Sequence, residues 1–586
     1  MKLIKNIIIA SALLGSMAAC SPEYNPDGRV DKSELFETDK KTFSYLNLCY
    51  SHLQQQRKGN WYGNDAFLSA FTDDAYDANS IDNSSSALYW RGVSTAYNFP
   101  VESGVNAGCW SEYFKGLNQC NTFLENIETA KVNQQEDRES WKAQCLILRA
   151  LYSLELAKRY NEIPYTTKSY DADFDFGSAE FKNFSAIARQ IFADCDAALE
   201  CESLPWNSGS NEALRGMMTK AVAYAVKSQT ALYAASPLYS DGSISWSEAA
   251  DITKTCLDAL RDNGFTLFTR AGAANQNISA YDSYFIARPD GARVTDKETI
   301  LETRDQMSVW VSSGLPSVTG SISAGTCPSQ ELVDMYETID GVQPILGYSD
   351  ASHLQPIINP EATLYDEQNP YANRDPRLAS TIYYHGGKRA LDSATSIINT
   401  SEDGAESIDL TKQDKKHSPT GYYLRKYNNF ASDLNNNADG YFRQFRFAEI
   451  LLNYAEAAAE ANANVPAEAY AAVNEVRARV NMPEIEGLSR DEFIKRVRNE
   501  RRVEFAFEEQ RYYDVRRWKV LDSNFSVITG MKVTEGSDGK TRFERIVVDN
   551  TRNCHDSKYL LSPIPGNEVV RILSLSGVRH QNPGWE

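Results

Sequence analysis

Three glutamates near the end of the chain have the spacing of a possible acid–base site. Glu500, Glu504 and Glu508 recur every four residues in a run rich in arginine, so on a helix they would share one face. Paired carboxylates are the catalytic groups of glycosidases, and one of them must hold its proton at neutral pH. Nearby arginines lower the pKa of a carboxylate, which is the opposite of that requirement. We therefore expect structural ion pairs with Arg501, Arg511 and neighbouring helices.

Other charged side chains invite the same interpretation. Arg374, Asp375 and Arg377 should form a turn held by its own charges, and Pro376 should stop any helix there. The sequence contains no nucleophile elbow, HExxH motif or P-loop. We therefore expect that the protein is not an enzyme. Further structural ion pairs are expected from Arg446, Glu449, Glu456, Arg477 and Arg479.

Aromatic and polar residues gather in a first loop-rich stretch, residues 59–108. Flat aromatic faces stack on sugar rings and polar neighbours bind the hydroxyls, so this stretch is the predicted sugar-contacting surface. Each single aromatic residue is about as often packed in a core as exposed to a ligand. Trp90 ranks first, and we expect Trp90→Ala to weaken glycan binding without unfolding the protein. The predicted contacts are Trp90, Trp61, Trp310 from the loop-rich region 264–423, Tyr89 and Arg91, followed by Tyr62, Asp74, Tyr97 and Asn98.

The sequence does not indicate a cofactor. Asp73, Asp74 and Asp77 offer carboxylates for a structural Ca²⁺, but their spacing differs from that of known calcium loops. The six histidines are scattered and form no ligand cluster.

The cysteines predict neither a disulfide framework nor a zinc site. There are ten, and lipidation of Cys20, argued below, would leave an odd number without a CxxC pair. Cys120, Cys145 and Cys195 lie on apolar helical faces, where buried thiols are expected. A few disulfides are compatible with this sequence, but the spacing does not indicate which cysteines would pair.

The first 20 residues have the pattern of a lipoprotein signal. Residues 1–5 carry two lysines, residues 7–14 are apolar, and two alanines precede Cys20. The apolar run is shorter than the roughly 20 residues that cross a bilayer. We expect acyl chains on Cys20, which would be the only membrane anchor. The alternative is ordinary cleavage near Ala18 or Ala19.

The expected organisation has three parts. A signal peptide (1–19) precedes a lipidated cysteine with a flexible tether (20–31) and a single helical domain (32–586). The formal charge of −19 becomes −21 when Lys2 and Lys5 leave with the signal. This excess of acid argues against nucleic acid or an anionic membrane surface as the partner. Within the domain we distinguish an N-terminal part (32–263), a loop-rich middle (264–423) and a C-terminal helical part (424–586).

Helical periodicity dominates both ends of this domain. Trp141, Cys145, Leu148 and Tyr152 recur at helical spacing, and alanines such as those in residues 221–225 allow helices to pack closely. The predicted fold class is mainly α, with tetratricopeptide-like helical hairpins, long loop-rich insertions and a few short strands. Helices are expected near residues 41–56, 111–129, 185–200, 218–235, 447–458 and 469–480, and over 491–518 as one long helix or a helix pair.

Motifs in a fixed order give the chain a family resemblance. NRDPRL stands at residues 373–378, RFAEILLNYAEA at 446–457, ERRVE at 500–504 and QNPGW at 581–585. Further fragments begin at Asn118. The chain resembles the SusD/RagB family of outer-membrane nutrient-binding lipoproteins, although Asn161 stands where that family usually has glycine.

The resemblance implies a function. Relatives bind oligosaccharides at the cell surface and deliver them to a SusC-like TonB-dependent transporter in the outer membrane, without a cofactor. Some relatives bind peptides, so the same scaffold with another cargo is the alternative. A polysaccharide-degrading enzyme and a surface adhesin are less favoured.

Overall fold

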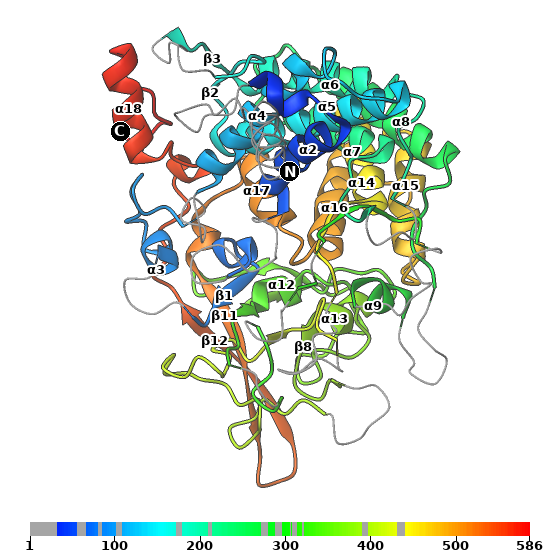
Figure 1. The fold of residues 1–586 in the computed structure, drawn as a ribbon. Coiled ribbons are helices and arrows are strands. Elements are labelled where there is room, and N and C mark those ends of the chain that lie inside the picture. Colours follow the sequence, from blue (N-terminus) through cyan, green and yellow to red (C-terminus); the bar gives the residue numbers. More distant parts are fainter. Residues whose placement is uncertain are drawn as a thin grey trace, which may run out of the picture.

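A computed structural model describes residues 32–54, 66–79, 85–100, 108–170, 178–208, 214–270, 279–286, 296–304, 306–307, 313–318, 322–389, 397–429 and 440–586. The fold is mainly helical, as predicted (Figure 1). Helices fill one half of the molecule, and loops with short strands fill the other. Within these ranges, no helix is both long enough and apolar enough to cross a bilayer.

The N-terminal helices pack on one another in chain order, in a tetratricopeptide-like arrangement. Close packing depends on small residues: a Cβ at Gly116 would lie 2.7 Å from the ring of Tyr152 on the next helix. The predicted helices are present, displaced by a few residues. They are α2 (Asp39–Gln54), α4 (Cys109–Asn126), α5 (Gln135–Tyr160), α6 (Phe184–Leu199) and α7 (Lys220–Ala235). The structure adds helices that were not predicted: α8 (Trp246–Asp262) and the short η1 (Lys32–Phe36), η2 (Leu68–Phe71) and α3 (Ser85–Trp90).

Asn161 ends α5 in a conformation that favours glycine. It has φ at 61° and ψ at −57°, and its N–H donates to the Ala157 carbonyl at 2.8 Å. The Glu162 N–H donates to the Tyr160 carbonyl at 2.7 Å, so Asn161 lies at the centre of a γ-turn, which is strained for residues other than glycine.

The C-terminal helices return to the scaffold: α14 packs on α7 and α8, and α15 and α16 pack on α14. They are α14 (Phe447–Ala461), α15 (Ala467–Ala478), α16 (Arg490–Glu504) and α17 (Gln510–Arg517). The run 491–518 is therefore a helix pair. Its break contains Phe507 and Glu509, both with positive φ. Ser489 and Glu492 form a capping box that starts α16.

The middle of the chain forms short helices and antiparallel strand pairs. Distant segments meet in two of these pairs, β1 with β5 and β4 with β10. The elements are β1 (Ala75–Asp77), β2 (Ile163–Pro164), β3 (Phe181–Lys182), α9 (Ala280–Phe285), β4 (Thr299–Glu302), β5 (Thr326–Pro328), α12 (Gln330–Asp334), β6 (Ile345–Tyr348), β7 (Pro356–Ile358), α13 (Pro376–Thr381), β8 (Ile382–Tyr383), β9 (Tyr423–Leu424) and β10 (Arg443–Arg446).

The longest strands come near the end of the chain. β11 (Ile528–Glu535) and β12 (Thr541–Asp549) form a hairpin that projects from the loop-rich half (Figure 1). The short helices η6 (Ser523–Ser526) and η7 (Ser557–Leu560) flank it, and α18 (Gly566–Ser576) lies at the edge of the molecule.

One large apolar core joins both ends of the chain. Side chains from α2, α4 to α8, α14 to α16 and the final segment up to Trp585 belong to the same buried cluster. A second buried cluster lies under the loop-rich half and includes Tyr281, Tyr427 and Phe507. The helical scaffold thus fixes the positions from which the charged and loop residues project.

Candidate functional site

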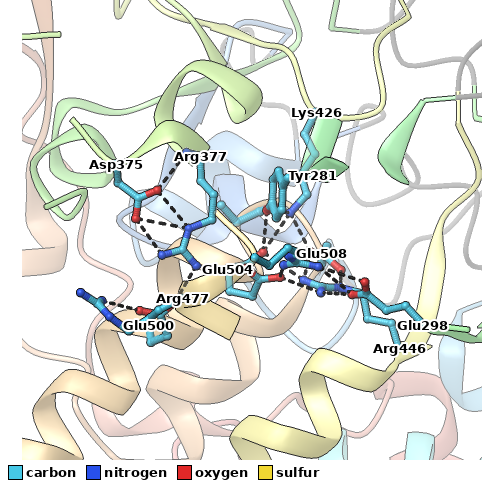
Figure 2. Close-up of polar contacts among 12 residues, drawn as sticks. Tyr281, Glu298, Asp375, Arg377, Lys426, Arg446, Arg477, Glu500, Glu504 and Glu508 are labelled. Atoms are coloured by element: carbon cyan, nitrogen blue, oxygen red, sulfur yellow. Dashed lines mark hydrogen bonds and ion pairs between the residues drawn. The ribbon is translucent and has the colours of Figure 1, made fainter. Parts of the chain in front are cut away.

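The carboxylates at the end of α16 lie in a buried ion-pair network (Figure 2). Arg446, at the junction of β10 and α14, donates from Nε to Glu508 at 2.7 Å and from Nη1 to Glu504 at 2.7 Å. Arg377 donates from Nη1 to Glu500 at 2.6 Å and to Glu504 at 3.0 Å. Although Glu508 lies beyond the end of α16, the turn returns its carboxylate to the same cluster.

Electrostatics separate this network from a glycosidase site. Burial alone would raise the pKa of Glu504, but Arg479, Arg446, Arg377 and Lys426 hold it well below its usual range. A general acid needs the opposite shift. The prediction of structural ion pairs with neighbouring elements is therefore confirmed, and the network cross-links β10, α13, α15 and α16. The expected partners on the same run differ, because Arg501 pairs with Asp514 and Arg511 with Asp73.

Lys426 is the buried amine of the network. Its Nζ donates to Glu508 at 2.6 Å, to the Tyr281 hydroxyl at 2.9 Å and to two backbone carbonyls of the turn after α16. Burial lowers its pKa to about 8, against the pull of Glu508. With its hydrogen bonds directed to protein atoms, this amine holds the turn in place.

A second buried network lies around α17. Arg517 donates to Glu456 at 2.6 Å and to Asp514 at 2.8 Å, and Arg501 donates to Asp514 at 3.0 Å. Arg517 and Arg501 outweigh the effect of burial and lower the pKa of Glu456. These charges also serve structure, as predicted. Glu449 differs, because burial raises its pKa and its partner is the amide of Gln229, at 2.6 Å.

The RDPRL segment corrects one prediction. Pro376 does not stop a helix: it is the first residue of α13, where its missing N–H costs nothing. Asp375 caps this helix by accepting from the Arg377 N–H at 2.9 Å. Asp375 and Arg377 pair with each other as expected, and Arg377 also reaches α16. Arg374 differs from the prediction, because its guanidinium donates to backbone carbonyls, among them those of Val333 and Tyr336.

Trp90, the first-ranked ligand contact, is packed inside the protein. It is 3% exposed, its Nε1 donates to the Ala70 carbonyl at 2.8 Å, and Arg552 lies 4.6 Å from its ring centroid. Tyr89 is fully buried and hydrogen-bonded by Arg516. This burial does not fit the predicted stacking role, because neither ring offers a face to a ligand.

Asp74 is also buried, for a different reason. Arg502 donates from Nε to its Oδ1 at 2.7 Å, and Arg511 donates to its neighbour Asp73 at 2.9 and 3.0 Å. Despite burial, Arg502 and Arg511 lower the pKa of Asp73 to about 2. The two carboxylates neutralise arginines, so they do not fit the suggested Ca²⁺ site.

Three of the predicted contacts lie at the described surface, and three cannot be placed. Tyr97 is 69% exposed, and its ring rests on Gly566 at the start of α18. Arg91 is exposed, and Asn98 is half-buried with its Oδ1 accepting from the Thr95 N–H at 2.7 Å. Trp61, Tyr62 and Trp310 lie outside the described residues.

A cavity of about 560 Å³ lies between the start of α4, the β2–β3 pair and α18. The rings of Phe181 and His580 stack in its wall with centroids 3.6 Å apart. Polar groups stand beside the rings, among them Ser111, Asn118 and Glu568. The volume suits a small ligand, and aromatic faces beside hydrogen-bonding groups suit a sugar.

Sequence reasoning missed this cavity. Its aromatic members on α4, Trp110 and Phe114, are spaced like an ordinary core stripe. The opposite wall comes from α18, more than 450 residues later in the chain. No local pattern could link the two walls.

One group of described residues could hold a metal ion. The thiols of Cys49, Cys120 and Cys145 are buried, and their sulfur atoms lie within 4.8 Å of one another. They belong to three helices, so their sequence spacing did not reveal them.

Comparisons with known proteins agree with the fold. The family model described as "SusD family" matches residues 290–585, and the model described as "Starch-binding associating with outer membrane" matches residues 31–232. The curated SusD-like protein P2 of Formosa agariphila is 30% identical over 174 residues, a match that covers 28% of this chain and 30% of that protein.

Solved structures match over nearly the whole chain. A SusD-like protein of Bacteroides fragilis has 23% identity and a TM-score of 0.73, covering 95% of this chain and 98% of its own. A SusD-like carbohydrate-binding protein of the same species has 22% identity, a TM-score of 0.67 and coverages of 91% and 98%. The surface glycan-binding protein A of Bacteroides fluxus has 20% identity, a TM-score of 0.58 and coverages of 94% and 100%.

Proposed function

We propose, from the premise that the chain belongs to the SusD family, that it binds an oligosaccharide at the cell surface and delivers it unchanged to a SusC-like TonB-dependent transporter. The observation that carries the proposal is the family match over residues 290–585. The second match carries an outer-membrane description over residues 31–232. Family members bind carbohydrate, and the aromatic-walled cavity offers chemistry suited to it.

The anchor is part of the same proposal. Acyl chains on Cys20 would hold the protein at the outer membrane, and the tether to residue 31 would let it move over the transporter pore. We expect Cys20→Ala to release the protein from the membrane fraction into the soluble fraction, as seen by immunoblotting of fractionated cells. Retention of the variant in the outer membrane would contradict the lipid anchor.

Two surfaces are proposed for the ligand, and they border α18. One is the exposed part of the first loop, with Tyr97, Arg91 and Asn98, to which Trp61 and Tyr62 are assigned by sequence alone. Trp310 is assigned by sequence alone from the loop-rich middle of the chain. The other is the cavity with the Phe181–His580 stack. An exposed aromatic ring offers a large flat area on which a sugar ring can stack.

A calorimetric screen with oligosaccharides tests the proposal, and two variants locate the site. We expect binding without product release. Tyr97→Ala should weaken binding about tenfold if the loop contacts the sugar, and Phe181→Ala should do so if the cavity contacts it. Phe43→Ala is the matched control, because Phe43 is 46% exposed on α2 and lines neither surface.

Each other outcome has a distinct meaning. Product release would indicate a degrading enzyme, and binding of peptides instead of glycans would indicate another cargo on the same scaffold. Co-purification with a large outer-membrane barrel is expected for a transporter partner. If the protein purified from detergent extracts binds glycan but brings no such barrel with it, that result would contradict delivery to a transporter and favour an adhesin.

A further inference from the structure

Three cysteines distant in sequence meet inside the helical scaffold. Cys49 comes from α2, Cys120 from α4 and Cys145 from α5, and all three are fully buried. Their sulfur atoms lie within 4.8 Å of one another. In the described part of the chain, no other group of cysteine, histidine or carboxylate side chains converges in this way.

The surrounding structure holds the three thiols in place. The Cys145 thiol donates to the Cys120 carbonyl at 3.6 Å, which links α5 to α4. The Tyr152 hydroxyl donates to the Cys49 carbonyl at 2.7 Å, which links α5 to α2. Gly116 lets α4 approach this tyrosine closely. The sulfur atoms therefore converge from a rigid frame of three packed helices.

The protonation of the thiols is uneven. Burial raises the pKa of Cys120 and of Cys145 well above the usual thiol value. Burial also acts against ionisation of Cys49, but hydrogen bonds from the other two thiols lower its pKa to about 5. The nearby Arg149 acts against this effect of burial at Cys120.

We propose that Cys49, Cys120 and Cys145 form a binding site for a single soft monovalent cation, Cu(I). Thiolates select soft metals, and three sulfur donors suit Cu(I), whereas structural zinc sites are almost always four-coordinate. The described group offers three donors and no fourth. With metal–sulfur bonds of roughly 2.3 Å, a three-coordinate site needs sulfur atoms about 4 Å apart, so the trio must close by less than about 1 Å.

Binding exchanges protons for the metal. The thiolate is the form that ligates a metal, so each cysteine that binds Cu(I) releases its thiol proton to solvent. No oxidant or reductant takes part, because copper enters and remains as Cu(I). Binding would pin α2 to the α4–α5 pair.

Titration of the full chain in detergent tests the site. The protein is refolded anaerobically with Cu(I) held by a chromophoric chelator, because an enclosed site fills most readily while the helices assemble. We expect the protein to withdraw one equivalent of Cu(I) from the chelator and to melt at a higher temperature with copper than without. Cys120→Ala and Cys145→Ala should each weaken Cu(I) binding at least about a hundredfold.

Controls separate metal binding from folding and from disulfide formation. Cys256→Ala removes a buried thiol outside the trio and should bind Cu(I) like the wild type. Circular dichroism reports whether each variant is folded. No uptake of Cu(I) by the folded wild type would overturn the proposal. A disulfide between two of the three cysteines, seen by intact mass after alkylation, would also overturn it. Glycan binding is measured separately, so failure of this site leaves the proposed function untouched.

Discussion

Replacing Glu504 by glutamine is expected to lower the free energy of unfolding by about 3–5 kcal/mol. Glutamine keeps the size of the side chain but removes the charge that Arg377, Arg446 and Arg479 share. Breaking a buried ion pair from one side leaves the partner charge uncompensated, and this is the magnitude measured for such losses. Urea unfolding followed by circular dichroism gives the number.

The matched control lies on the same helix. Asp491 pairs with Arg490 at the start of α16, and its side chain is 82% exposed, so Asp491→Asn should change the free energy of unfolding by less than about 1 kcal/mol. Equal losses in the two variants would show that burial of the network is not what makes Glu504 important.

The stability difference between the wild type and Glu504→Gln should depend on pH, because the fold lowers the pKa of Glu504. A carboxylate whose folded pKa is depressed stabilises the protein above its unfolded value, near 4.5, and loses that contribution as the pH falls through the folded pKa. The difference between the wild type and Glu504→Gln should therefore be full at pH 7 and should shrink as the pH falls well below 4.5. A difference that grows in acid would contradict the assigned ion pairs.

Trp90→Ala is expected to cost about 3–5 kcal/mol of stability, the range for deleting a buried large aromatic side chain. The ring packs against Tyr76, with centroids 4.9 Å apart, and beneath Arg552. Its removal leaves a cavity, and the Ala70 carbonyl keeps only the long hydrogen bond from Arg552, at 3.5 Å. Thermal and urea unfolding measure the loss.

Tyr97→Ala supplies the comparison for this prediction. Because Tyr97 is 69% exposed, its loss should change stability by no more than about 0.5 kcal/mol. A Trp90→Ala protein that keeps wild-type stability but loses glycan binding would restore Trp90 to the ligand surface.

The scaffold was predictable from the sequence because helices carry a local signal. Residues 141–152 show the apolar period of α5, and the run 491–518 shows that of α16 and α17. The formation of ion pairs was predictable, since nearby arginines keep a carboxylate ionised. Their partners were not, because Arg377 and Glu500 are brought together only by the fold.

The ligand surface was harder to predict because composition does not define burial. Trp90 and Tyr97 stand in the same aromatic-rich stretch, yet one is 3% exposed and the other 69%. The difference depends on Arg552 and on Gly566, which reach the stretch from the far end of the chain. Residues close in sequence therefore face opposite environments.

The β11–β12 hairpin is a case in which a usable signal was missed. Asp538-Gly539 is a common hairpin turn, and Gly539 has φ at 73°. The flanking segments 528–535 and 541–549 are rich in β-branched residues. The cysteine trio carried no such signal, because its members stand 71 and 25 residues apart on separate helices.

The clamp between Asp73, Asp74 and the arginines that follow them has a consequence for the order of folding. Arg502 and Arg511 lie 428 and 438 residues after their partners. If the chain is exported N-terminus first, residues 66–79 cross the membrane without these partners and wait until residue 511 has followed. Contacts so distant form late and slow the final assembly. The early helices can therefore pack while the rest of the chain is still crossing, but residues 66–79 are fixed only when the chain is nearly complete.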